Sequence, residues 1–240
     1  MNSCTICNKI FLNNREKSKH TNNPDKYCLN KHKIVEYHDN KYVVMDILSK
    51  RDKFLCVIDF DDFNKCKRHW NKTVAGYIYT EKIGHATKVY LHHIIMNGQL
   101  EENKTVDHIN RNTLDNRKAN FRIINQTHQN YNQNKKKRRK TYPKLVKDGI
   151  KDEDLPRCVS FSSKEERFNF ELKKDGKRIK TIKGTRQSLP NLRIKLNRLI
   201  KRIKEEIEKD PKLFEYYQMF GELTEEGEKL QKEYEEIISL

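Results

Sequence analysis

The chain has 240 residues, of which 35% are hydrophobic and another 35% are charged, and its formal net charge at pH 7 is +17. This composition argues against one large core and favours one to three small domains. No stretch approaches the roughly 18 consecutive apolar residues of a membrane span, and the N-terminus lacks an apolar signal-peptide core. We therefore expect a soluble, intracellular protein with no membrane partner.

The positive charge is unevenly distributed. Residues 200–240 contain seven Lys or Arg and twelve Asp or Glu, so the whole positive excess lies in the rest of the chain. A basic body indicates a polyanionic partner, because Lys and Arg release counterions from phosphate backbones. The alternative is a basic protein whose charge serves only solubility.

The N-terminal segment, residues 1–38, has the spacing of a zinc site. Four residues have suitable identities: Cys4, Cys7, Cys28 and His32. The first two form a tight knuckle, and one helical turn would bring the last two to the same side, with His20 as a rival for the fourth position. With Phe11 and Tyr27 near these pairs, the segment resembles a treble-clef zinc finger that would hardly fold without Zn²⁺. The alternative is four incidental residues.

The next segment, residues 39–134, begins with a strand-rich lead-in. Runs at 42–45 and 54–58 are rich in apolar and β-branched residues on either side of a charged turn, which predicts two strands. A short helix is predicted from 61 to 70, because a helix dipole favours the carboxylates at its start. The alternative use of those carboxylates is a second metal site. Residues 74–79 predict a further strand.

The rest of this segment, residues 88–134, carries the chemistry. Asp107 and His108 are adjacent, so in a strand or loop they point different ways, and one can hold a metal while the other faces a water. Asn120 stands just before an apolar run, and a polar stretch with helical prospects follows it. The order is strand, loop, strand and helix around one divalent cation.

This order of blocks resembles an HNH nuclease motif of the ββα-metal class, in the branch of phage and giant-virus homing-type endonucleases. The matching blocks lie within roughly residues 70–134: Tyr90–His93, Val106–Asn110, Leu114–Arg117, Asn120–Arg122 and the Asn-rich start of the helix. The resemblance implies a metal-dependent endonuclease that hydrolyses phosphodiester bonds in duplex DNA, site-selectively and as part of a mobile element. The alternatives are a non-catalytic zinc-finger DNA-binding regulator and a nonspecific or RNA-directed nuclease.

The resemblance also implies a role for each matched residue. His108 would be the general base, a role that suits a side chain whose pKa lies near neutral. Asp107 would bind Mg²⁺ or Mn²⁺, which prefer oxygen donors, and the cation would polarise the scissile phosphate. Asn120 would hold the loop that carries the base. The second metal ligand would be Asn130, with Gln129 and His128 as rivals.

A basic linker, residues 135–156, follows the motif. It begins with KKKRRK, six consecutive cations that cannot pack and that would lie along phosphates or serve as a nuclear localisation signal. Candidate DNA contacts from the motif, the linker and the C-terminal half are His92, His93, Arg117, Lys135, Lys136, Lys137, Arg138, Arg139, Lys173, Lys177, Arg178 and Lys180.

Residues 157–209 predict three strands and a helix. Apolar residues alternate in two stretches joined to a third by Asp175-Gly176, a strong hairpin turn. Ser188 is the expected N-cap, and an apolar stripe at helical spacing follows. With lysines and arginines on the outer sheet face, the segment resembles the DNA-binding domain of plant ethylene-response factors. The alternative is a generic small interaction domain.

The last segment, residues 210–240, alternates acidic with apolar residues. Its carboxylates would repel phosphate, so its apolar stripe is expected to dock on the same protein or on a partner, as a helix pair. Taken together, these segments predict a small multidomain chain of the α+β class.

Overall fold

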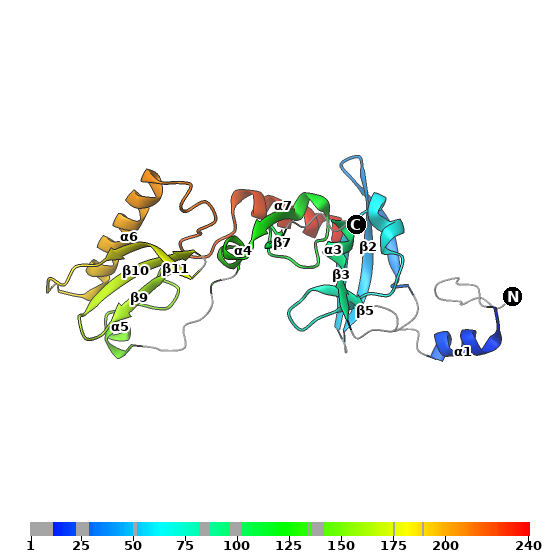
Figure 1. The fold of residues 1–240 in the computed structure, drawn as a ribbon, viewed down its shortest axis with the longest axis horizontal. Helices are drawn as coiled ribbons and strands as arrows, with labels where there is room; N and C mark the ends of the chain where they lie inside the picture. Colours follow the sequence, from blue (N-terminus) through cyan, green and yellow to red (C-terminus); the bar gives the residue numbers. More distant parts are fainter. Residues whose placement is uncertain are drawn as a thin grey trace. The chain divides into compact units, whose positions relative to one another are not determined.

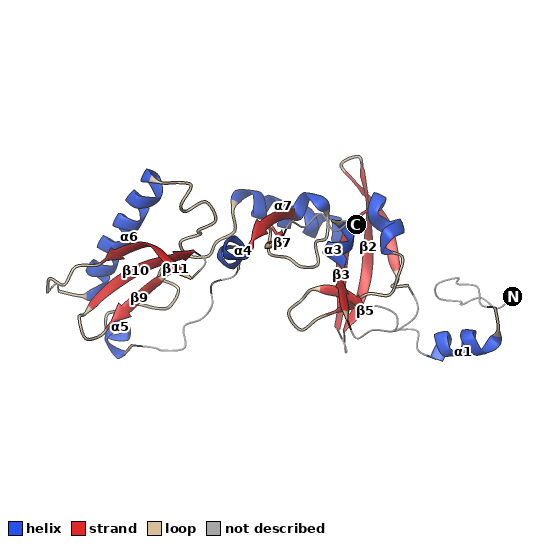
Figure 2. Cartoon of the chain, viewed as in Figure 1, coloured by secondary structure: helices blue, strands red, loops and turns tan. Residues whose placement is uncertain are grey.

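The computed structural model contains both helices and strands, which confirms the predicted α+β class (Figure 2). The described residues are 12–22, 29–49, 52–81, 87–96, 102–133, 135, 142–174, 176–188 and 190–240. The chain divides into two units, the first formed by residues 1–124 with 225–240 and the second by residues 125–224.

A three-stranded antiparallel sheet forms the centre of the first unit (Figure 1). Its strands, in the order β1-β2-β3, are β1 (His32–Tyr37), β2 (Asn40–Ser49) and β3 (Asp52–Asp59). Successive side chains of a strand point to opposite faces, and both faces of β2 are buried. Val43, Met45 and Ile47 pack on one face, while Val44 packs on the other.

Several short elements cover the first face of this sheet. They are the 3₁₀ helix η1 (Phe60–Cys66), the strands β4 (Asn71–Lys72), β5 (Ile78–Glu81) and β6 (Lys88–Tyr90), and the helix α3 (Leu91–Ile95). The fully buried Trp70 anchors them, because its indole N–H donates to the carbonyl of Cys66 at 2.8 Å. The helix predicted to reach Trp70 therefore ends at Cys66, and the strand predicted from 74 begins only at Ile78.

Residues 104–125 form a two-stranded sheet. It consists of β7 (Lys104–His108) and β8 (Phe121–Asn125), joined by a loop that ends in the 3₁₀ turn η2 (Lys118–Asn120). The loop is fixed to the edge of β3, because the N–H of Val57 donates to Leu114 at 2.9 Å and its carbonyl accepts from Asn116 at 2.8 Å.

The C-terminal helix α7 (Glu225–Ser239) covers the second face of the β1–β3 sheet. Its Tyr234 and Ile237 form one cluster with Val35, Val44 and Val57 of the three strands. The predicted pair of tail helices is wrong in its first half, because residues 211–224 form turns and irregular backbone within the second unit.

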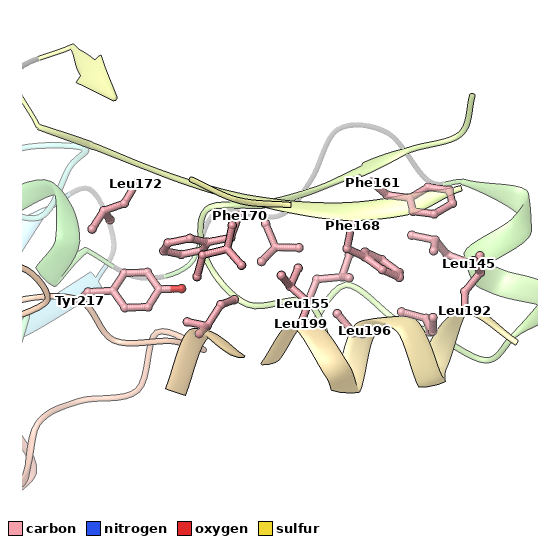
Figure 3. Close-up of a cluster of buried hydrophobic side chains, with 14 of the residues drawn as sticks. Leu145, Leu155, Phe161, Phe168, Phe170, Leu172, Leu192, Leu196, Leu199 and Tyr217 are labelled. Atoms are coloured by element: carbon pink, nitrogen blue, oxygen red, sulfur yellow. The ribbon is translucent and has the colours of Figure 1, made fainter. Parts of the chain in front are cut away.

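The second unit contains one sheet and one long helix packed on it (Figure 1). Its elements are α4 (Gln126–Asn132), α5 (Pro143–Lys147), β9 (Val159–Ser162), β10 (Arg167–Lys174), β11 (Lys177–Lys183) and α6 (Leu192–Lys209). The sheet is antiparallel in the order β11-β10-β9. Phe161, Phe168 and Phe170 point from its inner face towards Leu196 and Leu199 of α6, which confirms the predicted apolar stripe (Figure 3).

Two details of this unit differ from expectation. The helix α6 is capped by Asn191, whose Oδ1 accepts the N–H of Ile194 at 3.0 Å, and not by Ser188. Lys180 pairs with Leu172 of the inner face, in the same register as the pair of Ile182 with Phe170, and a β-bulge follows at Ile179, after which Lys173 pairs with Arg178. Lys180 forms an ion pair with Glu206 of α6, so its expected place on the outer face is wrong.

The N-terminal predictions are only partly covered by the described residues. Three of the expected zinc ligands lie outside them: Cys4, Cys7 and Cys28. The described residues begin with α1 (Asn14–Asn22), on which His20 is buried. Residues 29–31 are irregular and His32 begins β1, so the predicted helical turn ending at His32 is wrong.

The basic run is also mostly outside the described residues, which omit Lys136, Lys137, Arg138 and Arg139. Lys135 is described, and its ammonium group donates to the carbonyl of Asp152. Among the helices of the described residues, none has the length and apolarity that a membrane crossing requires.

Candidate active site

Asp107 and His108 end strand β7, and both are buried, at 6% and 4% exposure. As neighbours in a strand they point to opposite sides. Asp107 Oδ2 accepts a hydrogen bond from Nε of Arg122 on β8 at 2.9 Å, and Nη2 of the same guanidinium forms an ion pair with that oxygen at 2.8 Å. This charge-assisted contact orients the carboxylate.

The ring of His108 lies in an aromatic pocket. Phe121 meets it edge-to-face at a centroid distance of 5.1 Å, His92 at 5.4 Å, and Tyr77 lies 6.1 Å away. Burial lowers the pKa of His108 to about 4. The imidazole is therefore neutral at pH 7, which is the form that can accept a proton from water.

A glycine turn positions Tyr77 in this pocket. Gly76 has φ +100°, and a Cβ at this position would lie 2.7 Å from Oγ1 of Thr113 in the catalytic loop. The N–H of Gly76 donates to the carbonyl of Thr73 at 3.0 Å, which closes the turn. Only glycine combines this backbone conformation with so close an approach.

The helix α3 places two histidines differently. His92 is only 5% exposed, stacks on Tyr90 at 5.7 Å, and its Nδ1 has no hydrogen-bond partner among the described residues. Burial lowers the pKa of His92 to about 3, so this ring is also neutral. The expectation that His92 contacts DNA is corrected, because its ring packs against His108 inside the unit. His93 is exposed, and its phosphate contact stays a prediction.

Asn120 is hydrogen-bonded at several points to the loop that follows His108. Its Oδ1 accepts the N–H of Asn110 at 3.0 Å, and its Nδ2 donates to the carbonyl of Asp115 at 2.8 Å. Its own carbonyl accepts the N–H of Ile109 at 2.9 Å. Asn120 is fully buried, so all of these bonds are shielded from water.

Arg117 has a structural position that the sequence did not indicate. It is 1% exposed and forms a bidentate pair with Asp115, with Nε–Oδ1 and Nη2–Oδ2 distances of 2.8 Å. The other end of the guanidinium contacts Glu233 of α7 at 3.0 Å. The predicted DNA contact of Arg117 is therefore corrected, because its donors are bonded inside the unit.

Helix α4 carries the three candidates for a second metal ligand and belongs to the second unit, so their approach to Asp107 stays a prediction. Asn125 caps the helix, accepting the N–H of His128 at 2.9 Å. The ring of His128 packs on Tyr216 at 4.2 Å, which makes His128 the weakest candidate. The exposed Asn130 accepts a 3.3 Å hydrogen bond from Gln126, which also donates to Gln129 at 2.9 Å.

The chemistry of these donors fits a loosely held cation. No group of three or more His, Cys, Asp or Glu side chains within the described ranges is arranged to hold a metal. A closed structural zinc site is therefore absent from those ranges. Mg²⁺ needs fewer protein ligands than a structural zinc ion, since it keeps several waters and uses one or two carboxylates together with substrate phosphates. The oriented carboxylate of Asp107 beside a neutral imidazole meets that requirement.

The outer face of the β9–β11 sheet is polar and open. A groove of about 590 Å³ runs over it, with small polar residues such as Ser160 and Asn169 on its floor and Lys173, Arg178 and Lys183 along it. Arg178 is exposed and pairs with Glu171 at 2.7 Å, and Lys177 is exposed at the hairpin.

Comparisons with known proteins match the segment that contains Asp107 and His108. The family model described as "HNH endonuclease" matches residues 89–131. The chain is 29% identical over 228 residues to "Uncharacterized protein R424" of Acanthamoeba polyphaga mimivirus, which covers 88% of this chain and 64% of that relative. The chain thus spans less than two thirds of this relative's length. No solved structure matches the chain.

Proposed function

We propose that the protein is a metal-dependent endonuclease that hydrolyses phosphodiester bonds in duplex DNA. One observation carries the proposal: Asp107 and His108 stand side by side at the end of β7, the first oriented by Arg122 and the second buried and neutral. Both lie within the segment that is similar to HNH endonucleases.

In the proposed reaction His108 accepts the proton of the attacking water. Phe121, His92 and Tyr77 hold its ring, and Asn120 holds the loop behind it. Asp107 with Asn130 of α4 would hold Mg²⁺ or Mn²⁺. That cation would supply polarisation of the scissile phosphate and stabilisation of the leaving oxygen.

The remaining parts would select and hold the duplex. The open face of the β9–β11 sheet offers lysines and arginines to phosphates and small polar side chains to base edges. The N-terminal cysteines and His32 would add a zinc-stabilised DNA-binding module, and the basic run would follow the backbone. We propose a site-selective enzyme of the mobile-element type, in line with its resemblance to homing endonucleases.

A purified full-length chain incubated with duplex DNA and Mg²⁺ tests the proposal. Cutting should require the metal, stop with EDTA, and give ends that map to few positions. A nonspecific nuclease would instead give scattered ends, and an RNA-directed one would cut RNA in preference to DNA.

A second candidate function rests on the pairing of Arg122 with Asp107. A guanidinium can neutralise this carboxylate, as it would in a DNA-binding regulator that uses the same fold without catalysis. Such a protein would bind duplex DNA but leave it intact with Mg²⁺ and with Mn²⁺.

A further inference from the structure

The loop that carries His108 is bonded to the C-terminal helix through one buried guanidinium. Arg117 pairs with Asp115 of the loop through two 2.8 Å hydrogen bonds. Its Nη1 donates to Glu233 of α7 at 3.0 Å, and its Nη2 donates to the carbonyl of Leu230 at 2.9 Å. A planar guanidinium with both ends engaged holds its partners in one relative geometry.

On the loop side, Asp115 connects Arg117 to the residues that follow His108. Its Oδ2 accepts Nδ2 of Asn110 at 2.8 Å, and its carbonyl accepts Nδ2 of Asn120 at the same distance. Asn110 and Asn120 are joined to each other at 3.0 Å. Because Asn110 stands two residues after His108, a shift of Asp115 moves the backbone that carries the base.

On the helix side, α7 is fixed by the sheet. Leu230, Tyr234 and Ile237 are buried, and the hydroxyl of Tyr234 donates to the carbonyl of Leu55 in β3 at 2.6 Å. A second polar bond joins helix and loop, from Asn112 to Gln231 at 3.2 Å. The helix therefore supplies a rigid support for the loop.

We infer that Arg117 is a positioning residue through which helix α7 sets the geometry of the His108 loop. The C-terminal helix then acts on the loop through the contacts of Glu233 and Leu230 with Arg117, and Glu233 is the side-chain acceptor that completes the link. This inference rests on the proposed nuclease function. It goes beyond that function because it assigns a role to residues outside the segment that is similar to HNH endonucleases.

Substitution of Glu233 in the full-length chain tests the link at a residue remote from the reacting atoms. Glu233→Ala leaves the Nη1 donor of a buried Arg117 without its acceptor, so the loop should lose its fixed geometry. We expect kcat to fall about 2- to 30-fold while KM and the affinity for DNA stay unchanged. Glu233→Gln keeps an acceptor and should restore most of kcat.

Glu228→Ala is the matched control, because it removes the same charge from an exposed position of the same helix. It should leave kcat, KM and stability at wild-type values. If Glu233→Ala lowers the melting temperature but leaves kcat per folded molecule unchanged, α7 is only a structural support and the inference is wrong.

Hydrogen exchange gives a readout that needs no cleavage. In Glu233→Ala the amides of Ile109 and Asn110 should exchange faster, while those of β9–β11 should not change. If the wild-type chain does not cut DNA but Glu233→Ala still speeds exchange at these two amides, the nuclease function is wrong and the link between α7 and the loop stands. Unchanged exchange at both amides would overturn the link itself.

Discussion

The β1–β3 and β9–β11 sheets are both antiparallel with three strands in sequence order, but their faces are used differently. In the β1–β3 sheet both faces are covered, one by α3 and its neighbours and the other by α7. In the β9–β11 sheet α6 covers the inner face only, and the outer face is a polar groove. The first sheet can serve only as a scaffold, whereas the second keeps a surface on which a ligand can lie.

Under the proposed function, this difference separates chemistry from recognition. The loop that follows His108 is bonded to the two-sided sheet through Val57. The cationic side chains that would meet DNA stand on the open face of the one-sided sheet. Substitutions in the two places should therefore affect different steps.

The largest effect is expected from His108→Ala in the first unit. Removal of the general base should lower the cutting rate by about 10²- to 10⁴-fold. Affinity for duplex DNA should change little, because His108 is buried and neutral. Single-turnover rates and a binding titration measure the two quantities. A variant that cuts at the wild-type rate would exclude His108 as the base.

The next largest effect is expected from a substitution that creates a cavity under α7 and so lowers the free energy of unfolding. Ile237 is fully buried between α7 and the β1–β3 sheet, so Ile237→Ala should destabilise the first unit by about 2–5 kcal/mol in urea unfolding. Thr181→Ala on the open face of the other sheet is the control and should change stability by about 0.5 kcal/mol or less. Equal losses in the two variants would contradict the distinction between a two-sided and a one-sided sheet.

Helix α4 of the second unit should contribute a side-chain ligand to the metal ion. Asn130→Ala is expected to raise the Mg²⁺ concentration needed for half-maximal cutting about tenfold or more, because an oxygen donor is lost. Gln129→Ala should do much less, since adjacent helical residues point about 100° apart and only one can face Asp107. The reverse ranking would move the ligand to Gln129, and no response at either would point to His128.

The smallest of these effects concerns salt dependence. Replacing Arg178 and Lys183 together by Ala should reduce the slope of log affinity against log salt by about 2, with kcat unchanged. Lys180→Ala is the control, because this side chain turns to the helix side and pairs with Glu206. If Lys180→Ala alters the slope as much as the double variant does, the outer face is not the DNA contact.

The sequence predicted features that depend on local order. Asp107 and His108 at a strand end, the three strands of residues 157–209 and the apolar stripe of α6 all follow from residue patterns within a few positions. Features that depend on distant partners were not predictable. Nothing near Arg117 indicates that its guanidinium meets Glu233, which is 116 residues away in the chain.

Other errors arose from single irregularities of the backbone. The bulge beyond Leu172 takes Ile179 out of the register and leaves it at 37% exposure, against the simple alternation expected for a strand. The sequence also did not indicate that Arg122 pairs with Asp107, because this contact depends on β8 lying next to β7.

The division of the chain also has a consequence for its synthesis. Residues 125–224 are translated between the two parts of the first unit. At about 5–20 residues per second, the ribosome takes about 5–20 s to make this unit before it reaches Glu225. During that time α7 has not been made, so Arg117 lacks its acceptor Glu233 and the second face of the β1–β3 sheet is uncovered. All residues of the second unit are therefore synthesised before the first unit can close on α7.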